Sequence, residues 1–405
     1  MGNEQQGAGP LSGIRVLDFS RILSGPYATQ ILADLGAEVI KVETVDKGDE
    51  TRHFPPFQGD LSHYFIALNR GKKSIALNLK SERGAQLARE LAAKVDIVVE
   101  NFRPGVMDKL GLGYDVLAKD NSGLLYCSIS GFGSDSPLSD KPAFDIVAQA
   151  LSGIMSINRE AGAAPNRLGI PLGDMAGGIF GLFGILAALV ERERTGKGQR
   201  IDVAMLDGLM GMLGYLAQIY FVTGKAPEPV GTKHPNIVPY GAYPASDGHV
   251  IVACLTEQFW HNFARALEKP ELISDPRFAE YAARLENRAL LEEIVEERMR
   301  GNDKGYWLDR LREFDVPSAP ILDVGEALEQ AHTSQSDLVG TSYHEAVGEM
   351  QYLRTPIRFA GKPLDGSTPP PLLGEQTADV LSDFLGIDER EIEELSEQSV
   401  AFQRS

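Results

Sequence analysis

The chain has 405 residues, of which 43% are apolar and 24% charged, the proportions of a globular protein rather than a disordered one. This length allows two domains. The 57 acidic residues outnumber the 39 basic ones and give a net charge of −18, which argues against nucleic acid and membrane as partners. An anionic small molecule would therefore need a local basic pocket.

The first half of the chain alternates predicted strands and helices. Short apolar stretches predict strands over residues 14–20, 37–43, 95–100 and 124–130. Amphipathic stretches between them predict helices over residues 26–36 and 81–94. This order indicates an α/β fold, a mostly parallel sheet wrapped by helices. Ligands of such sheets bind beyond the carboxyl ends of the strands, where the loops "SRILSGP", "ENFRPG" and "SGFGSDSP" hold polar residues.

The longest apolar run, Met175–Val190, predicts a buried helix rather than a membrane span. Its 16 residues include four glycines and fall short of the ~20 that cross a bilayer. Cys127 and Cys254 fall inside predicted strands, as small buried hydrophobes of a reducing compartment do. The N-terminus lacks the basic and apolar regions of a signal peptide, so we expect a cytoplasmic protein.

The composition shifts after residue 223. Residues 224–236 are rich in Pro, Gly and Lys and predict a linker. Strands and charged helices follow and predict a smaller α+β domain over residues 237–320. The tail over residues 321–405 predicts a further linker and helices.

Familiar cofactor motifs are absent from the sequence, which has no phosphate-binding G-x-x-x-x-G-K-[ST], no H-E-x-x-H and no C-x-x-C. We therefore expect no metal and no permanently bound cofactor. One acid stands out, because Asp174 opens the long apolar run. Asp is among the best helix N-cap residues, so this position alone fits either a cap or a chemical role.

Several blocks together resemble the class III CoA-transferases, a family that includes formyl-CoA:oxalate and carnitine CoA-transferases and α-methylacyl-CoA racemase. They are "LSGIRVLDFSRILSGPYATQILADLGAEVIKVE", "NRGKKSIALNLKS", "DIVVENFRPGVMDKLGLGYD", "FDIVAQALSG", "GDMAGG", "RTGKGQRIDVAMLDG" and "PLLGEQT". The resemblance runs from about residue 11 to 380. It implies a large Rossmann-like domain over residues 1–223, to which the chain returns after the small domain, and an interlinked homodimer.

The family's catalytic aspartate corresponds to Asp174. The resemblance implies that Asp174 attacks an acyl-CoA thioester and forms an aspartyl anhydride, which becomes an aspartyl-CoA thioester. An acceptor acid then attacks this thioester and takes the CoA. CoA and acyl-CoA are then substrates, and no metal or ATP is needed. Gly177 and Gly178 would allow close backbone approach to the developing oxyanion. The acceptor expected from the resemblance is a small dicarboxylate such as succinate, malate, mesaconate, itaconate or glutarate.

The resemblance also implies a CoA site that combines apolar residues for the adenine with cations for the phosphates. Its residues would be Arg21, Ile22, Ser24, Thr44, Leu77, Asn101, Phe102, Lys109, Leu110 and Met205. The acceptor would contact Arg52, Tyr64 and Phe144, with Arg21 and His53 as further candidate cations. Arg21 and Leu23 replace the His and Gln of the formyl-CoA:oxalate enzyme, and its long central glycine loop is missing, which argues against oxalate.

Two alternative functions remain. A racemase needs two proton-transfer groups, and the family's racemases place a His where this chain has Phe144, which carries no proton. A CoA-binding subunit without catalytic activity is the second alternative, against which the presence of Asp174 argues.

Overall fold

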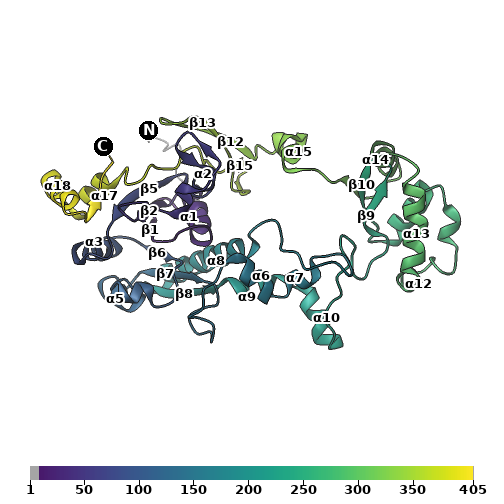
Figure 1. Ribbon diagram of the computed structural model, residues 1–405, viewed down its shortest axis with the longest axis horizontal. Coiled ribbons are helices and arrows are strands. Elements are labelled where there is room, and N and C mark those ends of the chain that lie inside the picture. The colour runs from purple at the N-terminus through teal and green to yellow at the C-terminus, as the bar shows by residue number, and fades with distance from the viewer. Residues whose placement is uncertain (1–8, 405) are drawn as a thin grey trace. The chain divides into compact units, whose positions relative to one another are not determined.

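The computed structural model describes residues 9–404, so the N-terminal segment that bears on targeting lies largely outside the described residues. The chain forms two compact units, each drawn in Figure 1. Unit 1 comprises Met1–Ile154, Leu168–Gly214 and Ala331–Ser405, and unit 2 comprises Met155–Arg167 and Tyr215–Gln330.

A seven-stranded sheet forms the centre of unit 1. All of its strand pairs are parallel except the pair at one edge, where the last strand runs antiparallel to its neighbour. In spatial order the strands are β16 (Ala401–Phe402), β5 (Lys72–Leu77), β2 (Glu38–Glu43), β1 (Arg15–Asp18), β6 (Ile97–Glu100), β7 (Leu125–Ser130) and β8 (Gln199–Ala204).

Helices cover both faces of this sheet. The helices of unit 1 are α1 (Ser24–Asp34), α2 (His63–Asn69), α3 (Glu82–Ala92), α4 (Val106–Lys109), α5 (Tyr114–Asp120), α6 (Asp145–Leu151), α8 (Leu172–Thr195), α9 (Met205–Met212), α16 (Ala331–Gln335), α17 (Thr377–Leu385) and α18 (Glu389–Glu397). The short helix α7 (Ile154–Ile157) bridges the two units in sequence. Smaller elements are the 3-10 turn η1 (Glu50–His53) and the hairpins β3 (Phe57–Gln58) with β4 (Leu61–Ser62), β12 (Val339–His344) with β13 (Gly348–Leu353), and β14 (Arg358–Phe359) with β15 (Lys362–Pro363).

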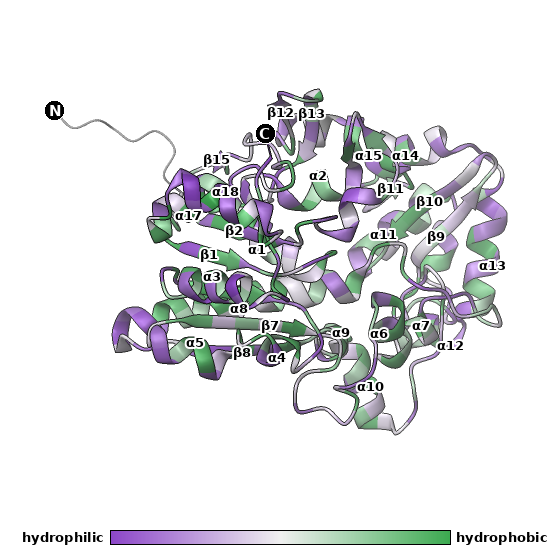
Figure 2. Cartoon of the chain, turned by 60° about the vertical axis from the view of Figure 1, so that its left-hand side comes forward, coloured by the Kyte–Doolittle hydropathy of each residue, from purple (hydrophilic) through white to green (hydrophobic). Residues whose placement is uncertain are grey.

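Alternate residues of each central strand enter different cores, as the period of two in a strand requires. In β1, Val16 joins the core made with α1, α8 and α9, whereas Leu17 joins the core made with α3, α17 and α18. The central strands are therefore apolar on both faces. Figure 2 shows the hydropathy of the residues along them. The predicted parallel sheet wrapped by helices is confirmed.

Besides the two-residue edge strand β16, two strands of this sheet escaped the sequence analysis. The first half of β5 holds Lys72 and Lys73, and β8 contains Arg200 and Asp202. Neither strand is a continuous apolar run, so the apolar pattern used for the other strands did not detect them.

Unit 2 is a smaller α+β body. Its antiparallel sheet has the order β11 (Ser318–Pro320), β10 (Gly248–Ala253) and β9 (Tyr240–Ala245). Around it lie α10 (Tyr215–Thr223), α11 (Glu257–Ala266), the 3-10 turn η2 (Pro270–Ile273), α12 (Tyr281–Glu286), α13 (Arg288–Met299), α14 (Lys304–Glu313) and α15 (Val324–Glu329). Trp260 and Trp307 are fully buried in its core.

The unit boundaries differ from the predicted domains, which placed residues 155–167 and 215–223 in the first domain. Both segments belong to unit 2. One physical reason is the hydrogen bond of 3.0 Å that the Gly231 amide donates to the Arg159 carbonyl, which ties the first segment to the residues that follow α10.

Helix α8 is the one described helix that is long and apolar enough by itself to cross a membrane, and half of its most apolar window is buried. The bent pair α9 and α10 passes the same test when taken together. Glycines fit α8 closely against α1. A Cβ at Gly178 would lie 2.6 Å from the Ser24 carbonyl oxygen, so only glycine permits this approach.

We expect Gly178→Ala to destabilise the protein by about 1–3 kcal/mol, because the added methyl group meets backbone that cannot rotate away. Gly211→Ala is a matched control, since its Cβ would meet nothing within 4 Å and α9 would gain helix propensity. Urea unfolding of both variants measures the difference. Equal stability of the two variants would contradict this account of the α1–α8 contact.

Candidate functional site

A pocket of about 900 Å³ opens at the carboxyl ends of the parallel strands, where the sequence predicted a ligand site. Its walls come from the loops after β1, β2, β5, β6 and β7 and from α8 and α9. The predicted site residues that line it are Arg21, Ile22, Ser24, Thr44, Leu77, Asn101, Phe102, Leu110, Phe144, Asp174 and Met205. Those that do not line it are Arg52, His53, Tyr64, Lys109, Gly177 and Gly178.

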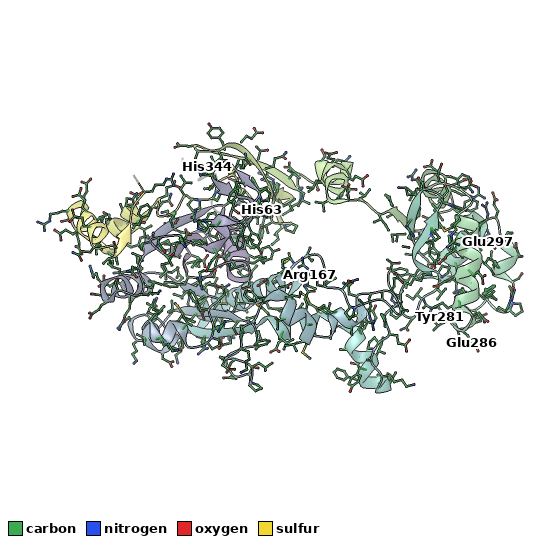
Figure 3. The ribbon with its side chains drawn as sticks, in the orientation of Figure 1. His63, Arg167, Tyr281, Glu286, Glu297 and His344 are labelled. Atoms are coloured by element: carbon green, nitrogen blue, oxygen red, sulfur yellow. The ribbon has the colours of Figure 1, made fainter. Side chains whose placement is uncertain are left out.

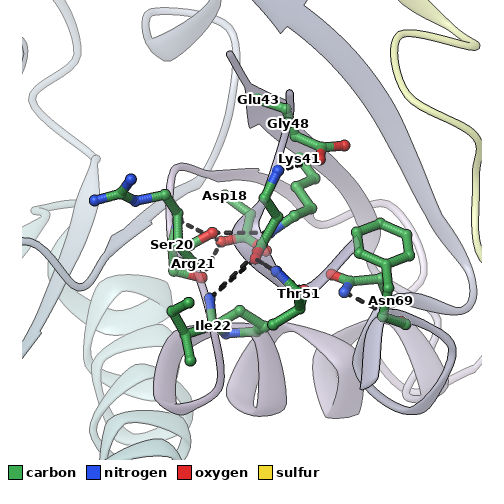
Figure 4. A network of polar contacts seen from close by, with 12 residues as sticks. Asp18, Ser20, Arg21, Ile22, Lys41, Glu43, Gly48, Thr51 and Asn69 are labelled. Carbon is green, nitrogen blue, oxygen red and sulfur yellow. Dashed lines mark hydrogen bonds and ion pairs between the residues drawn. The ribbon is translucent and has the colours of Figure 1, made fainter. Parts of the chain in front are cut away.

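The loop between β1 and α1 rests on a buried network of charges (Figure 4). The Lys41 ammonium lies 2.9 Å from the Asp49 carboxylate and donates a 2.8 Å hydrogen bond to the Ser20 carbonyl. The Lys72 ammonium lies 3.1 Å from the Asp18 carboxylate. Burial raises the pKa of Asp49, but Lys41 and hydrogen bonds from Thr51 outweigh it and bring the pKa to about 2. Burial lowers the pKa of Lys72 to about 8 despite Asp18.

Ile22 adopts a left-handed conformation, with a φ of 65°, which is rare for a β-branched residue. Its amide N–H lies 3.3 Å from both carboxylate oxygens of Asp49, the same group that pairs with Lys41. The buried network therefore holds a strained residue in the wall of the pocket, and such strain is typical of functional loops.

Asn101, the first residue after β6, holds the same loop in place. Its side-chain oxygen accepts a 2.8 Å hydrogen bond from the Arg21 amide, and its nitrogen donates to the Arg21 carbonyl at 2.7 Å and to the Ser24 hydroxyl at 3.1 Å. The Arg21 guanidinium stacks 4.8 Å from the centre of the Phe102 ring and pairs with Glu50 at 2.7 Å. Asn101 thus shapes the pocket by positioning Arg21 and Ser24.

Asp174 is the third residue of α8 and not its N-cap, which is Pro171. The capping role belongs to Asp145 on α6, whose carboxylate accepts a 2.7 Å hydrogen bond from the Gly173 amide. Within residues 9–404, no hydrogen bond or ion pair engages the Asp174 carboxylate. Its two oxygens are therefore available to a ligand.

Burial, and then the negative charge of Asp145, raise the pKa of Asp174 to about 7. A helix N-terminus favours a carboxylate by ~0.3–1 kcal/mol. That is less than the 1.36 kcal/mol that one pKa unit represents, so the dipole is outweighed. Tyr64 on α2 responds to the same charges, since burial, then Asp174 and Asp145, raise its pKa.

Gly177 and Gly178 do not fit the predicted oxyanion role. They lie in the second turn of α8, where amide N–H groups bond to carbonyls four residues earlier. A Cβ at Gly177 would lie 3.0 Å from Ile129, and one at Gly178 would meet Ser24. These glycines serve close packing of α8.

Arg52 does not offer a free cation to an acceptor acid. Its guanidinium makes two hydrogen bonds to Glu43, at 2.6 and 2.8 Å, and stacks 3.6 Å from the centre of the Phe65 ring. His53 contacts the Lys47 carbonyl at 3.0 Å. Lys109 is exposed on α4, one residue before Leu110 at the pocket wall.

Three exposed cations that the sequence analysis did not single out also line the pocket, namely Lys80, Arg103 and Lys141. Together with Arg21 they supply the local positive charge that a protein of net charge −18 needs for an anionic ligand. Lys80 and Arg103 stand in the blocks "NLKS" and "ENFRPG", three residues after the ends of strands β5 and β6. This position after a strand is the sequence feature that could have identified them as pocket residues.

His63 lies on α2 and His344 at the end of β12 (Figure 3). Among the described residues no three or more His, Cys, Asp or Glu side chains are grouped so that they could hold a metal ion. Cys127 and Cys254 are free and buried, and burial raises the pKa of both thiols, so neither is a reactive nucleophile.

An α/β sheet whose carboxyl edge carries a pocket with exposed cations, and an unpaired carboxylate at the start of a helix, define a protein suited to covalent chemistry on an anionic ligand. Residues 11–377 match the model of CoA-transferase family III, and the chain belongs to this family. It is an enzyme of the CoA-transferase class, which moves CoA from an acyl-CoA to a carboxylic acid.

Similar proteins agree with this assignment. The chain is 39% identical to an acetyl-CoA:oxalate CoA-transferase of Acetobacter aceti over 93% of this chain and 96% of that protein. It is 38% identical to a succinyl-CoA:glutarate CoA-transferase of Mus musculus over 95% of this chain and 89% of that protein. A crystal structure of a CAIB/BAIF family protein from Brucella suis superimposes with a TM-score of 0.84 at 37% identity, over 93% and 100% of the two chains.

The raised pKa of Asp174 predicts a pH-dependent gain in stability for Asp174→Asn. The folded protein binds this proton more tightly than the unfolded chain, in which the pKa of the carboxyl has its ordinary value of 3.8, so wild-type stability falls as the pH rises from about 4 to 7. Asparagine has no carboxyl group, so the stability of Asp174→Asn does not fall with pH for this reason. We expect it to be more stable by about 2 kcal/mol at pH 8, a figure reduced for water in the pocket, and to match the wild type near pH 4.

Thermal unfolding between pH 4 and 8 measures this difference. Asp207→Asn is the control, because Asp207 also lies in the first turn of a helix, α9, but is exposed to water. A stability difference for Asp174→Asn that does not change with pH would show that its carboxylate is not destabilised by its surroundings.

Proposed function

We propose that the protein transfers CoA from an acyl-CoA to a small dicarboxylic acid, with Asp174 as the nucleophile. The observation that carries this proposal is the Asp174 carboxylate, which lines the pocket, lacks a protein partner within the described residues and has its pKa raised to about 7. A nucleophilic carboxylate needs free oxygens, and a higher pKa makes it a stronger nucleophile once it is ionised.

The reaction would begin when an Asp174 oxygen attacks the thioester carbonyl, releasing CoA thiolate and leaving an aspartyl–acyl anhydride. The thiolate then attacks the aspartyl carbonyl, which releases the donor acid and leaves an aspartyl-CoA thioester. The acceptor carboxylate attacks this thioester, and the same two steps run in reverse. Every intermediate keeps an activated acyl bond, so the exchange needs no external energy source.

We propose that CoA lies along the pocket wall formed by the loops after β1, β5 and β6. Leu77, Phe102 and Leu110 supply the apolar contact area, and Lys80, Arg103 and Lys141 supply charge for the phosphates. Ile22, Ser24, Thr44 and Met205 complete this wall, and Asn101 acts by holding the loop that carries Arg21.

Two relatives named for dicarboxylates, oxalate and glutarate, support a dicarboxylate acceptor. The departures at Arg21 and Leu23 do not exclude oxalate, since a protein 39% identical to this chain is named for it. With Arg52 held by Glu43, Arg21 is the better candidate for the second carboxylate. Its ion pair with Glu50 is exposed, and such pairs cost little to exchange.

We expect Asp174→Ala to reduce transfer below a few per cent of the wild-type rate, because the other carboxylate near the start of α8, Asp145, has both oxygens bonded to Gly173 and Gln149. CoA binding should remain, since the basic wall is untouched. The measurements are succinyl-CoA turnover with glutarate or oxalate, followed by mass spectrometry, and CoA affinity by calorimetry. Turnover near the wild-type level would overturn the role of Asp174.

We also propose that the protein is a homodimer in the cytoplasm, with interlinked chains as in its family. On α8, Phe180, Phe183 and Val190 fall on one face and are 38%, 58% and 74% exposed. Helix α10 is apolar and has no buried residue. Apolar surfaces of this kind in a soluble enzyme mark contacts with another chain.

Sedimentation over a thousandfold range of concentration should show a dimer throughout, because interlinked chains separate only on unfolding. The control is Val190→Lys, which adds a charge to the exposed face of α8. It should still sediment as a dimer, because interlinked chains stay together when one surface contact is weakened. A folded wild-type monomer at the dilute end would contradict the interlinked arrangement.

A further inference from the structure

Asp145 connects the starts of two helices. It is the first residue of α6, and its Oδ1 accepts the 2.7 Å hydrogen bond from Gly173 in the first turn of α8. Its Oδ2 accepts a 2.7 Å hydrogen bond from the side-chain amide of Gln149. The Gln149 oxygen in turn accepts from the Leu168 amide at 2.8 Å, just before α8. Asp145 is thus fixed on both oxygens and cannot swing away from Asp174.

This arrangement places a second carboxylate close to the nucleophile. Gly173, which bonds to Asp145, directly precedes Asp174 in the chain. Asp145 and Gln149 are buried, and Asp145 acts on Asp174 as a like charge. With Asp174 ionised, two negative charges share a site that water reaches only in part. The repulsion ends when the Asp174 carboxylate is converted to an anhydride or a thioester, because neither an anhydride nor a thioester carries a charge.

We propose that Asp145 is a positioning residue whose fixed negative charge favours the covalent, uncharged form of Asp174 over the free carboxylate. The inference rests on the proposed function. The relevant exchange converts the Asp174 carboxylate and an acyl-CoA into the aspartyl-CoA thioester and the free donor carboxylate. The C–S bond of the acyl-CoA breaks, a C–S bond to the aspartyl carbonyl forms, and one Asp174 oxygen leaves in the donor acid. The negative charge therefore moves from the buried site to a small acid that can enter water.

The experiment measures the extent of this exchange at equilibrium. Purified enzyme is incubated with succinyl-CoA and a fixed concentration of succinate, without any other acceptor. Intact-protein mass spectrometry then gives the ratio of aspartyl-CoA enzyme to free enzyme. We expect Asp145→Asn to lower this ratio about five- to tenfold, which corresponds to a like-charge effect of up to about one pKa unit on Asp174. The asparagine oxygen can still accept from Gly173, so α8 keeps its start.

Two further variants separate charge from scaffolding. Gln149→Met removes the hydrogen bond to Asp145 but leaves both carboxylates, and it should keep the wild-type ratio. Asp145→Ser is a second neutral variant that can accept from Gly173, and it should lower the ratio as Asp145→Asn does. If Asp145→Asn does not fold, this variant carries the test.

The results can overturn the inference in two ways. An unchanged or increased ratio in the neutral Asp145 variants would refute the role of the charge. An equal loss in Gln149→Met would show that Asp145 acts only as a scaffold. Absence of any adduct on the wild-type enzyme, or an adduct on Asp174→Ala, would instead refute the proposed function itself.

Discussion

Two buried ammonium groups determine the shape of the pocket. Lys41 and Lys72 stand on neighbouring parallel strands, and their carboxylate partners Asp49 and Asp18 come from the loop after β2 and from β1. A buried charge without its partner costs several kcal/mol, so these segments cannot separate while the sheet is folded. Through Asp49 the network also bonds the amide of Ile22 and holds its left-handed backbone. The sheet core thereby fixes a loop that would otherwise be free at the site.

The close packing of helix α8 is a second constraint on the site. Gly177, Gly178 and Gly181 allow α8 to lie close to α1 and β7, and this closeness brings the start of α8 to the rim of the pocket. A larger residue at these positions would displace the helix by at least part of an ångström, and a nucleophile misplaced by that amount loses much of its rate. The glycines matter to the chemistry through packing rather than through their amides.

The sequence was sufficient for most of the fold because the central strands are apolar on both faces and the helices carry ordinary start and stop signals. It failed for β5 and β8, whose lysines, arginine and aspartate are used in ion pairs or at the sheet edge. At the site, the three loops that the sequence placed beyond the carboxyl ends of the strands do line one pocket. It could not show that Arg52 is held by Glu43, since no local feature of the sequence reveals the partner of a charged residue.

A carboxylate at the start of a helix can either cap the helix or act as a nucleophile, and these two roles need opposite surroundings. A capping carboxylate has its oxygens bonded to amides, which lowers its pKa and its reactivity. A nucleophilic carboxylate needs free oxygens and a raised pKa. In this chain the two roles fall to different residues, since Asp145, 28 positions before Gly173, bonds the free amide of α8. Asp174 then lies two residues inside the helix start, with its carboxylate open to the pocket, at a cost in stability that the rest of unit 1 offsets.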